Sequence, residues 1–321
     1  MSCDREELAP DVPSVSGKIQ IAGDDFLTIS NLNVSTRRRG NSPPMAKKAG
    51  TGPLACAGRV GTPWVGMDRW FLLAATLLAA VAGTWGIISV HRGRRSHWTV
   101  VWMTAAFLCQ IGFLTVRGEM RAACPLMDRG EILVFLAWSL MLFYLLVGPA
   151  YRISLLGVFT APVVVIFQAA ALIPGVLSWD PIKLVGGNAW HETHSAMSVL
   201  GYGALALAAV AGVMFLVLDR QLKEHHLQGG LFRNLPPVRE LLVSMERLLW
   251  LGGGLLTIGI VAGFLMPQTD AAWGHLIVAV SVWVGYALLL GIKRVRGLTG
   301  RRFSLSAVVL FVLSLAVFAF V

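Results

Sequence analysis

After residue 66 the chain alternates long apolar stretches with short polar connections. Each stretch is long enough to cross ~30 Å of hydrocarbon at ~1.5 Å per residue. A backbone in hydrocarbon satisfies its hydrogen bonds internally as a helix, and the alternating pattern of a membrane β-strand does not occur here. The pattern therefore predicts an all-α fold, a polytopic membrane helical bundle with about eight transmembrane helices. The stretches cover residues 70–90, 98–116, 131–148, 154–175, 194–218, 248–266, 274–292 and 303–321.

The composition fits a lipid bilayer better than water. Of the 321 residues, 56% are hydrophobic and only 14% are charged, and the mean hydropathy is +0.69. Soluble domains carry roughly a quarter charged residues, so these values argue against a soluble enzyme. The net charge of +10 would suit a nucleic-acid partner, but with so little polar surface we assign the excess Lys and Arg to loops beside membrane spans. We expect no nucleic acid to bind.

The first 66 residues differ in composition from the rest. They are rich in Ser, Pro, Gly and charge, include the run Arg37–Arg39, and show no sustained apolar period, which is typical of disorder. Met67-Asp68-Arg69-Trp70 leads straight into the first apolar stretch, so Met67 is a candidate translation start; a genuine extension before it is the alternative. The predicted organisation is a disordered polar tail, 1–66, followed by a membrane domain, 67–321.

Positive charge is distributed unevenly among the connections. Those after the first, third, fifth and seventh stretches hold most of the Lys and Arg, which by the positive-inside rule places them in the cytoplasm and both chain ends outside. The connection 117–129 is an exception, because it lies on the outer side but carries Arg117, Arg121 and Arg129. Acidic residues, Glu119 and Asp128 among them, are interspersed with these arginines.

Histidines fall at the outer ends of two stretches. His191 and His194 lie at the start of the fifth stretch and His275 at the start of the seventh, so two helices bring imidazoles to one membrane depth. Ionisable groups at such positions are rare and often functional, and imidazoles from facing helices can hold haem iron from both sides. We take His194 and His275 as candidate axial metal ligands, and His191 and Trp273 as further candidate haem contacts. The alternative for each histidine is a solvated, chemically idle side chain in the headgroup region.

No catalytic motif stands out, so whether the protein is an enzyme stays open, with the balance against it. The segment His191-Glu192-Thr193-His194 has three-residue spacing, whereas a zinc-binding HExxH needs four. The four cysteines form no CxxC or CxxCH, so covalent c-type haem attachment is not encoded. A haem would therefore be haem b, held non-covalently.

Seven segments of the sequence are together typical of one protein family. They are Cys124–Glu131, Phe135–Trp138, His194–Gly203, Asp219–Lys223, Leu235–Pro237, Met245–Leu249 and Leu256–Gly259. Together they resemble the cytochrome c assembly proteins of the CcsA, CcmC and HemX type, with Glu131 at the family's acidic position. The later segments look most like the HemX and YpjD-like branch. The resemblance covers almost everything after Met67. It implies haem handling or cytochrome c biogenesis, with His194 and His275 as the family's histidines.

One segment of that family is missing. Haem-delivering members carry a tryptophan-rich WGxxWxWD segment on an outer loop, and this chain offers only Trp273-Gly274 before an apolar run. A flat aromatic platform could hold an exposed porphyrin for transfer. Its absence puts haem export and ligation to apocytochrome in doubt and leaves haem binding within the bundle open.

Our leading hypothesis is a protein of the bacterial cytoplasmic (inner) membrane that binds haem b through two histidines near the outer leaflet. Its partners would be haem, lipid, and other cytochrome c assembly or membrane proteins. Arg117, Arg121 or Lys183 are candidate cations for the haem propionates. One alternative is a cofactor-free accessory or regulatory subunit of a partner such as an ion-transport protein. A secondary transporter ranks lower, since no inverted repeat is visible.

Overall fold

A computed structural model describes residues 66–92, 97–150, 155–179, 181, 183, 188–223, 238–266 and 270–320. The predicted polar tail lies outside the described residues, apart from Gly66. Within them the chain forms helices and no strands, as predicted. The helices are α1 (Met67–His91), α2 (Trp98–Arg121), α3 (Arg129–Ala150), α4 (Leu156–Ala171), α5 (Ala189–Lys223), α6 (Val238–Phe264), α7 (Asp270–Arg296) and α8 (Gly300–Phe320).

The protein is a multi-pass membrane protein by the length and composition of its helices. Six of the described helices, α1, α2, α3, α5, α6 and α7, are long and apolar enough to cross a membrane. The predicted count of about eight crossings is therefore not confirmed. The helix α4 has 16 residues, which at ~1.5 Å per residue is shorter than the hydrocarbon core.

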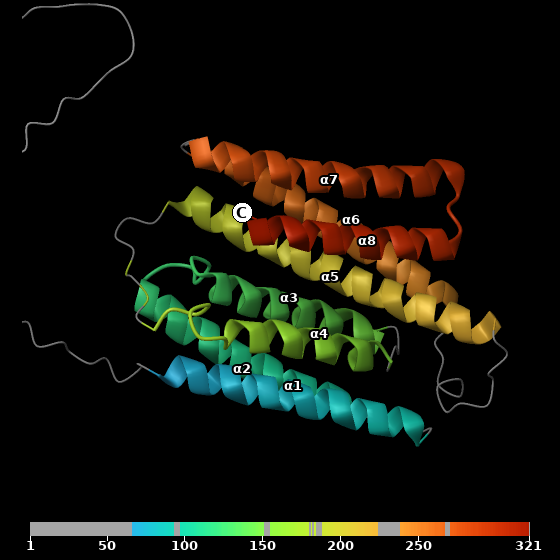
Figure 1. The fold of residues 1–321 in the computed structure, drawn as a ribbon, viewed down its shortest axis with the longest axis horizontal. Coiled ribbons are helices and arrows are strands. Elements are labelled where there is room, and N and C mark those ends of the chain that lie inside the picture. The colour runs from blue at the N-terminus through green and yellow to red at the C-terminus, as the bar shows by residue number, and fades with distance from the viewer. Residues whose placement is uncertain are drawn as a thin grey trace, which may run out of the picture. The chain divides into compact units, whose positions relative to one another are not determined.

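The helices lie along one common direction, with α5 in the middle of the bundle (Figure 1). On one side α5 packs against α3 and α4, and on the other it packs against α6 and α8. A central position demands a helix that is apolar all round, and residues 201–212 of α5 are all buried and rich in Gly and Ala. Small side chains let four neighbouring helices approach one axis closely.

Two glycines of α5 show how close this approach is. A Cβ added at Gly203 would clash with the Ser139 side chain of α3, and one added at Gly201 would lie 3.1 Å from the backbone oxygen of Gly252 in α6. Gly203 therefore marks where α5 meets the α1–α4 half, and Gly201 where it meets α6, and at both positions a larger side chain would push the helices apart.

The predicted fourth stretch, 154–175, is wrong at its end. The helix α4 stops at Ala171, and Gly175 adopts a φ of +89°, which turns the chain back over the start of α3. There Gly130 N–H donates a hydrogen bond of 3.1 Å to the Val176 carbonyl. Apolar character alone did not distinguish these loop residues from helix, because exposed apolar residues such as Ile173 occur in the loop as well as on the helices.

Several other helices extend past their apolar stretches. Ten residues that precede the predicted sixth stretch belong to α6, and α5 continues to Lys223. The added turns carry charges, and one of them, Glu246, forms an ion pair of 2.9 Å with Lys293 of α7. Helices can continue into the polar region beyond hydrocarbon because solvent and ion pairs there satisfy charged side chains.

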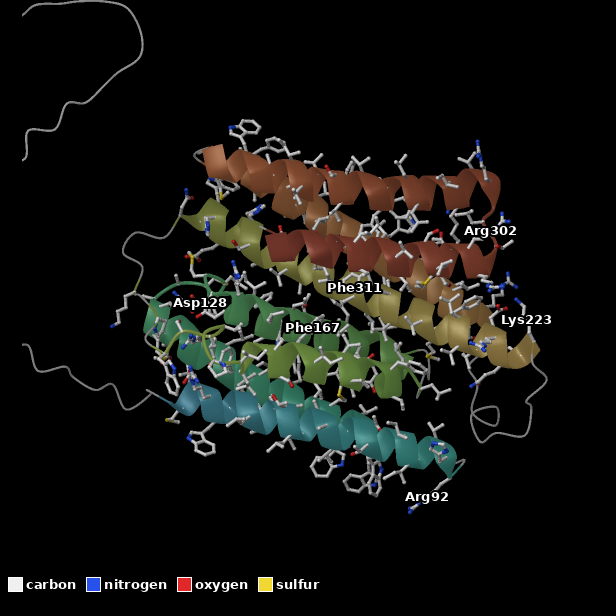
Figure 2. All side chains as sticks on the ribbon, in the orientation of Figure 1. Arg92, Asp128, Phe167, Lys223, Arg302 and Phe311 are labelled. Atoms are coloured by element: carbon white, nitrogen blue, oxygen red, sulfur yellow. The ribbon has the colours of Figure 1, made fainter. Side chains whose placement is uncertain are left out.

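The two ends of the bundle differ in charge. Arg92, Lys223 and Arg302 lie at one end, here called the Arg302 end, and Asp128 lies at the other, the Asp128 end (Figure 2). The described basic side chains of α5, α7 and α8 gather at the Arg302 end, at Arg220, Lys223, Lys293, Arg294, Arg296, Arg301 and Arg302. This segregation agrees with the orientation predicted from the connections.

Candidate functional site

His194 sits in the second turn of α5 with its ring against α6. Its Nδ1 lies 2.7 Å from the carbonyl oxygen of Gly259. A carbonyl oxygen only accepts hydrogen bonds, so Nδ1 is the protonated nitrogen that donates. In a neutral imidazole this leaves Nε2 with a free lone pair, which is the form that binds a metal ion.

Two glycines of α6, one turn apart, lie against this part of α5. A Cβ added at Gly263 would lie 2.8 Å from His194 Nδ1, and one added at Gly259 would lie 2.5 Å from Ser198 Oγ. Contacts this short are not tolerated by real side chains. Gly263 therefore forms a seat for the His194 ring that only glycine can provide, and Gly259 admits the next turn of α5 at Ser198.

The start of α7 reaches the same seat. The added Cβ at Gly263 would lie 2.7 Å from Leu276 Cδ1, and Leu276 is buried. Leu276 directly follows His275, so the fold brings the α7 segment that carries His275 beside His194. The side chain of His275 lies outside the described residues, and its role as a ligand stays a prediction.

The two further candidate haem contacts, His191 and Trp273, lie at the starts of α5 and α7. His191 is half-buried in the first turn of α5, and Trp273 is 47% exposed in the first turn of α7. No described contact joins either of them to His194. Their proposed contact with a haem remains a prediction.

A buried ion network occupies the same end of the bundle. Arg117 of α2 is 0% exposed, and its guanidinium reaches Asp68 of α1 at 3.0 Å and Glu131 of α3 at 2.9 Å. It also donates to the Ser178 carbonyl at 2.7 Å, in the loop after α4. One side chain thus joins three helices and a loop through charge-assisted hydrogen bonds.

A second arginine completes the network. Arg121 Nε donates to Glu131 Oε1 at 2.6 Å, and its guanidinium lies 2.8 Å from Asp128. The other carboxylate oxygen of Glu131 accepts the backbone N–H groups of Met127 and Asp128, at 3.1 and 3.2 Å. Glu131 therefore caps the start of α3 while it neutralises two guanidinium groups.

Asp128 is held ionised by this arrangement. Burial alone would raise its pKa, but the Ser178 hydroxyl that donates to it and the positive charge of Arg121 outweigh burial and hold the pKa of Asp128 below its usual range. Protonation of Asp128 at low pH should therefore destabilise the folded state.

These contacts correct one expectation and explain another. Arg117 and Arg121 were candidate cations for haem propionates, but their charges are already compensated by Asp68, Asp128 and Glu131. Lys183, by contrast, is exposed. The network also gives the arginines of this outer connection a structural role, because Arg117 and Arg121 are buried and paired with carboxylates.

Sequence reasoning missed the network as a unit. The available signal was the spacing of Arg117 and Arg121, which places both on one helix face, followed closely by Asp128 and Glu131. Asp68 could not be found this way, since it lies 49 residues before Arg117.

The network adjoins the start of α5. Burial raises the pKa of the Cys124 thiol, and the negative charges of Glu192 in α5 and Glu131 in α3 raise it further. Cys124 is free and half-buried.

Across the described parts of the chain, no three His, Cys, Asp or Glu side chains gather as a metal site.

Comparison with known proteins identifies related sequences. The model of one family, described as cytochrome C assembly protein, matches residues 127–321. Cytochrome c biogenesis protein CcsA of Gloeobacter violaceus is 25% identical over 297 residues, covering 74% of this chain and 87% of that protein. CcsA of Synechococcus sp. (strain CC9605) is 27% identical and covers 73% and 85%. CcsA of Ranunculus macranthus is 36% identical over a shorter region, 36% of this chain and 38% of that protein.

Proposed function

We propose that this chain, which belongs to the cytochrome c assembly protein family, binds haem within its membrane bundle and uses His194 as one axial ligand. The observation that carries the proposal is the 2.7 Å contact from His194 Nδ1 to the Gly259 carbonyl. Metal-ligating histidines commonly donate their second ring N–H to a carbonyl or carboxylate, which fixes the tautomer and the ring orientation. His194 has this arrangement with the Gly259 carbonyl.

His275 is the proposed second ligand. Its neighbour Leu276 lies at the same point of α6 as the His194 ring, so α5 and α7 hold the two histidine positions at one height of the bundle. Two histidines would together hold the iron and leave no position for an external ligand, which would suit electron transfer or storage better than ligand binding. The protein's own part is to present unprotonated nitrogens and to cover the porphyrin with apolar helix faces.

We place the protein in cytochrome c biogenesis as a haem-handling member of the HemX and YpjD-like branch, in the bacterial cytoplasmic membrane. The relatives named CcsA support the biogenesis role. The absence of the tryptophan-rich outer segment from the sequence favours haem that is retained in the bundle over haem that is passed on. Lys183 is the remaining candidate for a propionate contact.

The test is a visible spectrum of the purified protein after haem-replete expression. We expect a Soret band and, on reduction, an α-band of a b-type haem, both lost in His194→Ala and in His275→Ala. His91→Ala, at the end of α1 and exposed, is the matched control and should keep the spectrum. A colourless wild-type protein, or an unchanged spectrum in both ligand variants, would contradict the proposal and favour a cofactor-free accessory subunit.

A further inference from the structure

Two glutamines inside the first half of the bundle stand out from their surroundings. Gln110 of α2 and Gln168 of α4 are both 0% exposed. Neither the carbonyl oxygen nor the amide nitrogen of either side chain meets a hydrogen-bond partner among the described residues. A buried carboxamide without partners costs free energy, and water cannot reach it from hydrocarbon, so such groups call for a bound partner.

The contacts of α1 show that both glutamines lie at one height. Against α2, α1 is in register through the Asp68–Arg117 ion pair and through Gly86, where an added Cβ would lie 3.4 Å from Thr99 Oγ1. Between these two points the antiparallel helices bring Gln110 opposite Ala75.

The same reasoning applies to α4. An added Cβ at Gly83 would lie 3.2 Å from Ala161, and one at Gly86 would lie 2.9 Å from Val158. Continuing this antiparallel register brings Gln168 opposite residues 75 and 76 of α1. Ala75, at this height of α1, is itself 0% exposed.

Apolar layers enclose this level on both sides. Toward the Asp128 end lies a compact cluster that includes Leu72 and Phe113, and deeper in the bundle a second cluster begins with Ala79 and Ala106. The level of Ala75 lies ~12 Å along α1 from its start, which is inside the span. The polar layer is therefore closed off from the charged network by apolar side chains.

We propose that Gln110 and Gln168 bind water enclosed between α1, α2 and α4. A charged ligand would lack a counter-charge in this layer, and an apolar one would leave both carboxamides unsatisfied. A neutral molecule that donates and accepts hydrogen bonds matches a carboxamide, which does both, and water is the smallest such molecule. This site is independent of haem and of His194.

Hydroxyl-radical labelling with a pulsed X-ray beam tests the proposal in the full-length protein. Radicals form from the bound water itself, so Phe113 should be labelled although it is 0% exposed. Phe303, which is equally buried in α8, serves as the internal control and should stay unlabelled. The double variant Gln110→Leu with Gln168→Leu should lose the labelling of Phe113.

Three results would contradict the proposal that water is bound here. Labelling of Phe113 no greater than that of Phe303 in the wild type would overturn the proposal without any variant having to fold. Labelling that survives the double variant would also overturn it. A high-resolution map that shows the two carboxamides bonded directly to each other, with no density between, would replace water by a glutamine pair.

Discussion

The Nδ1 atom of His194 lies 2.7 Å from the carbonyl oxygen of Gly259, across the interface of α5 and α6. This single contact fixes which ring nitrogen carries the proton, and it depends on Gly263 having no side chain and on the close approach of α5 and α6 at Gly259. The geometry of a candidate ligand is thus decided by backbone atoms of a neighbouring helix. Changes in α6 should alter the site even where they touch no candidate ligand.

Substituting Gly263 by alanine should displace the His194 ring. The new Cβ would lie 2.8 Å from Nδ1 and 2.7 Å from Leu276 Cδ1, so the ring or α7 must move. We expect the haem content per protein to fall strongly and the bands of the remaining haem to shift, measured by absorption spectroscopy and pyridine haemochrome assay.

Gly253→Ala is the control for this change, because it is on the same helix and no atom lies within 4 Å of its added Cβ. Equal haem content and equal spectra in the two alanine variants would show that Gly263 does not position the ring.

Replacing Arg117 by methionine should destabilise the protein substantially. The change leaves Asp68 and Glu131 buried with less positive charge beside them, and breaking a buried ion pair in this way costs about 3–5 kcal/mol. The free energy of unfolding in detergent or lipid should fall by that order. The exposed Arg302→Met should change it by no more than about 0.5 kcal/mol, and a similar small effect at Arg117 would refute a stabilising network.

Acid should weaken the Asp128 end of the bundle. The pKa of Asp128 is lower in the fold than the ordinary value of about 3.9, so the native state favours the ionised form. Its contribution to stability is present above that ordinary value and is lost as the pH falls through the lower, folded pKa. The melting temperature of wild type should therefore drop in acid.

Asp128→Asn should lower the melting temperature at neutral pH and flatten its fall in acid. Asp219→Asn, which removes a carboxylate paired with the exposed Lys223, is the control for losing a surface charge. A wild-type acid profile retained in full by Asp128→Asn would mean that other carboxylates govern the response.

Gly203→Ala should weaken the packing of α5 against α3, which joins the two halves of the bundle. Its Cβ would clash with Ser139 of α3, and overpacking of this kind typically costs about 1–3 kcal/mol. Adding Ser139→Gly should restore part of the loss, because it removes the atoms in conflict. Gly291→Ala, with no atom within 4 Å of its Cβ, should be close to neutral when unfolding is followed by thermal melting.

The sequence alone determined the helical membrane fold and the approximate helix positions, while the membrane depth of His194 and His275 stays a prediction. Helix formation and membrane insertion depend on the apolar character of about twenty consecutive residues, which can be read locally. The same reading extended the fourth stretch past Ala171, since apolar residues such as Leu172 and Ile173 occur in this loop as well as in helices.

Only the tertiary structure decided which side chains meet. His194 and Gly259 are 65 residues apart, and Asp68 and Arg117 are 49 apart, so no local period links them. Their contacts follow from the register of packed helices, which is set by small residues such as Gly203 at the crossings. A one-residue shift turns a helix by about 100°, and it would separate each pair without changing the pattern of apolar residues.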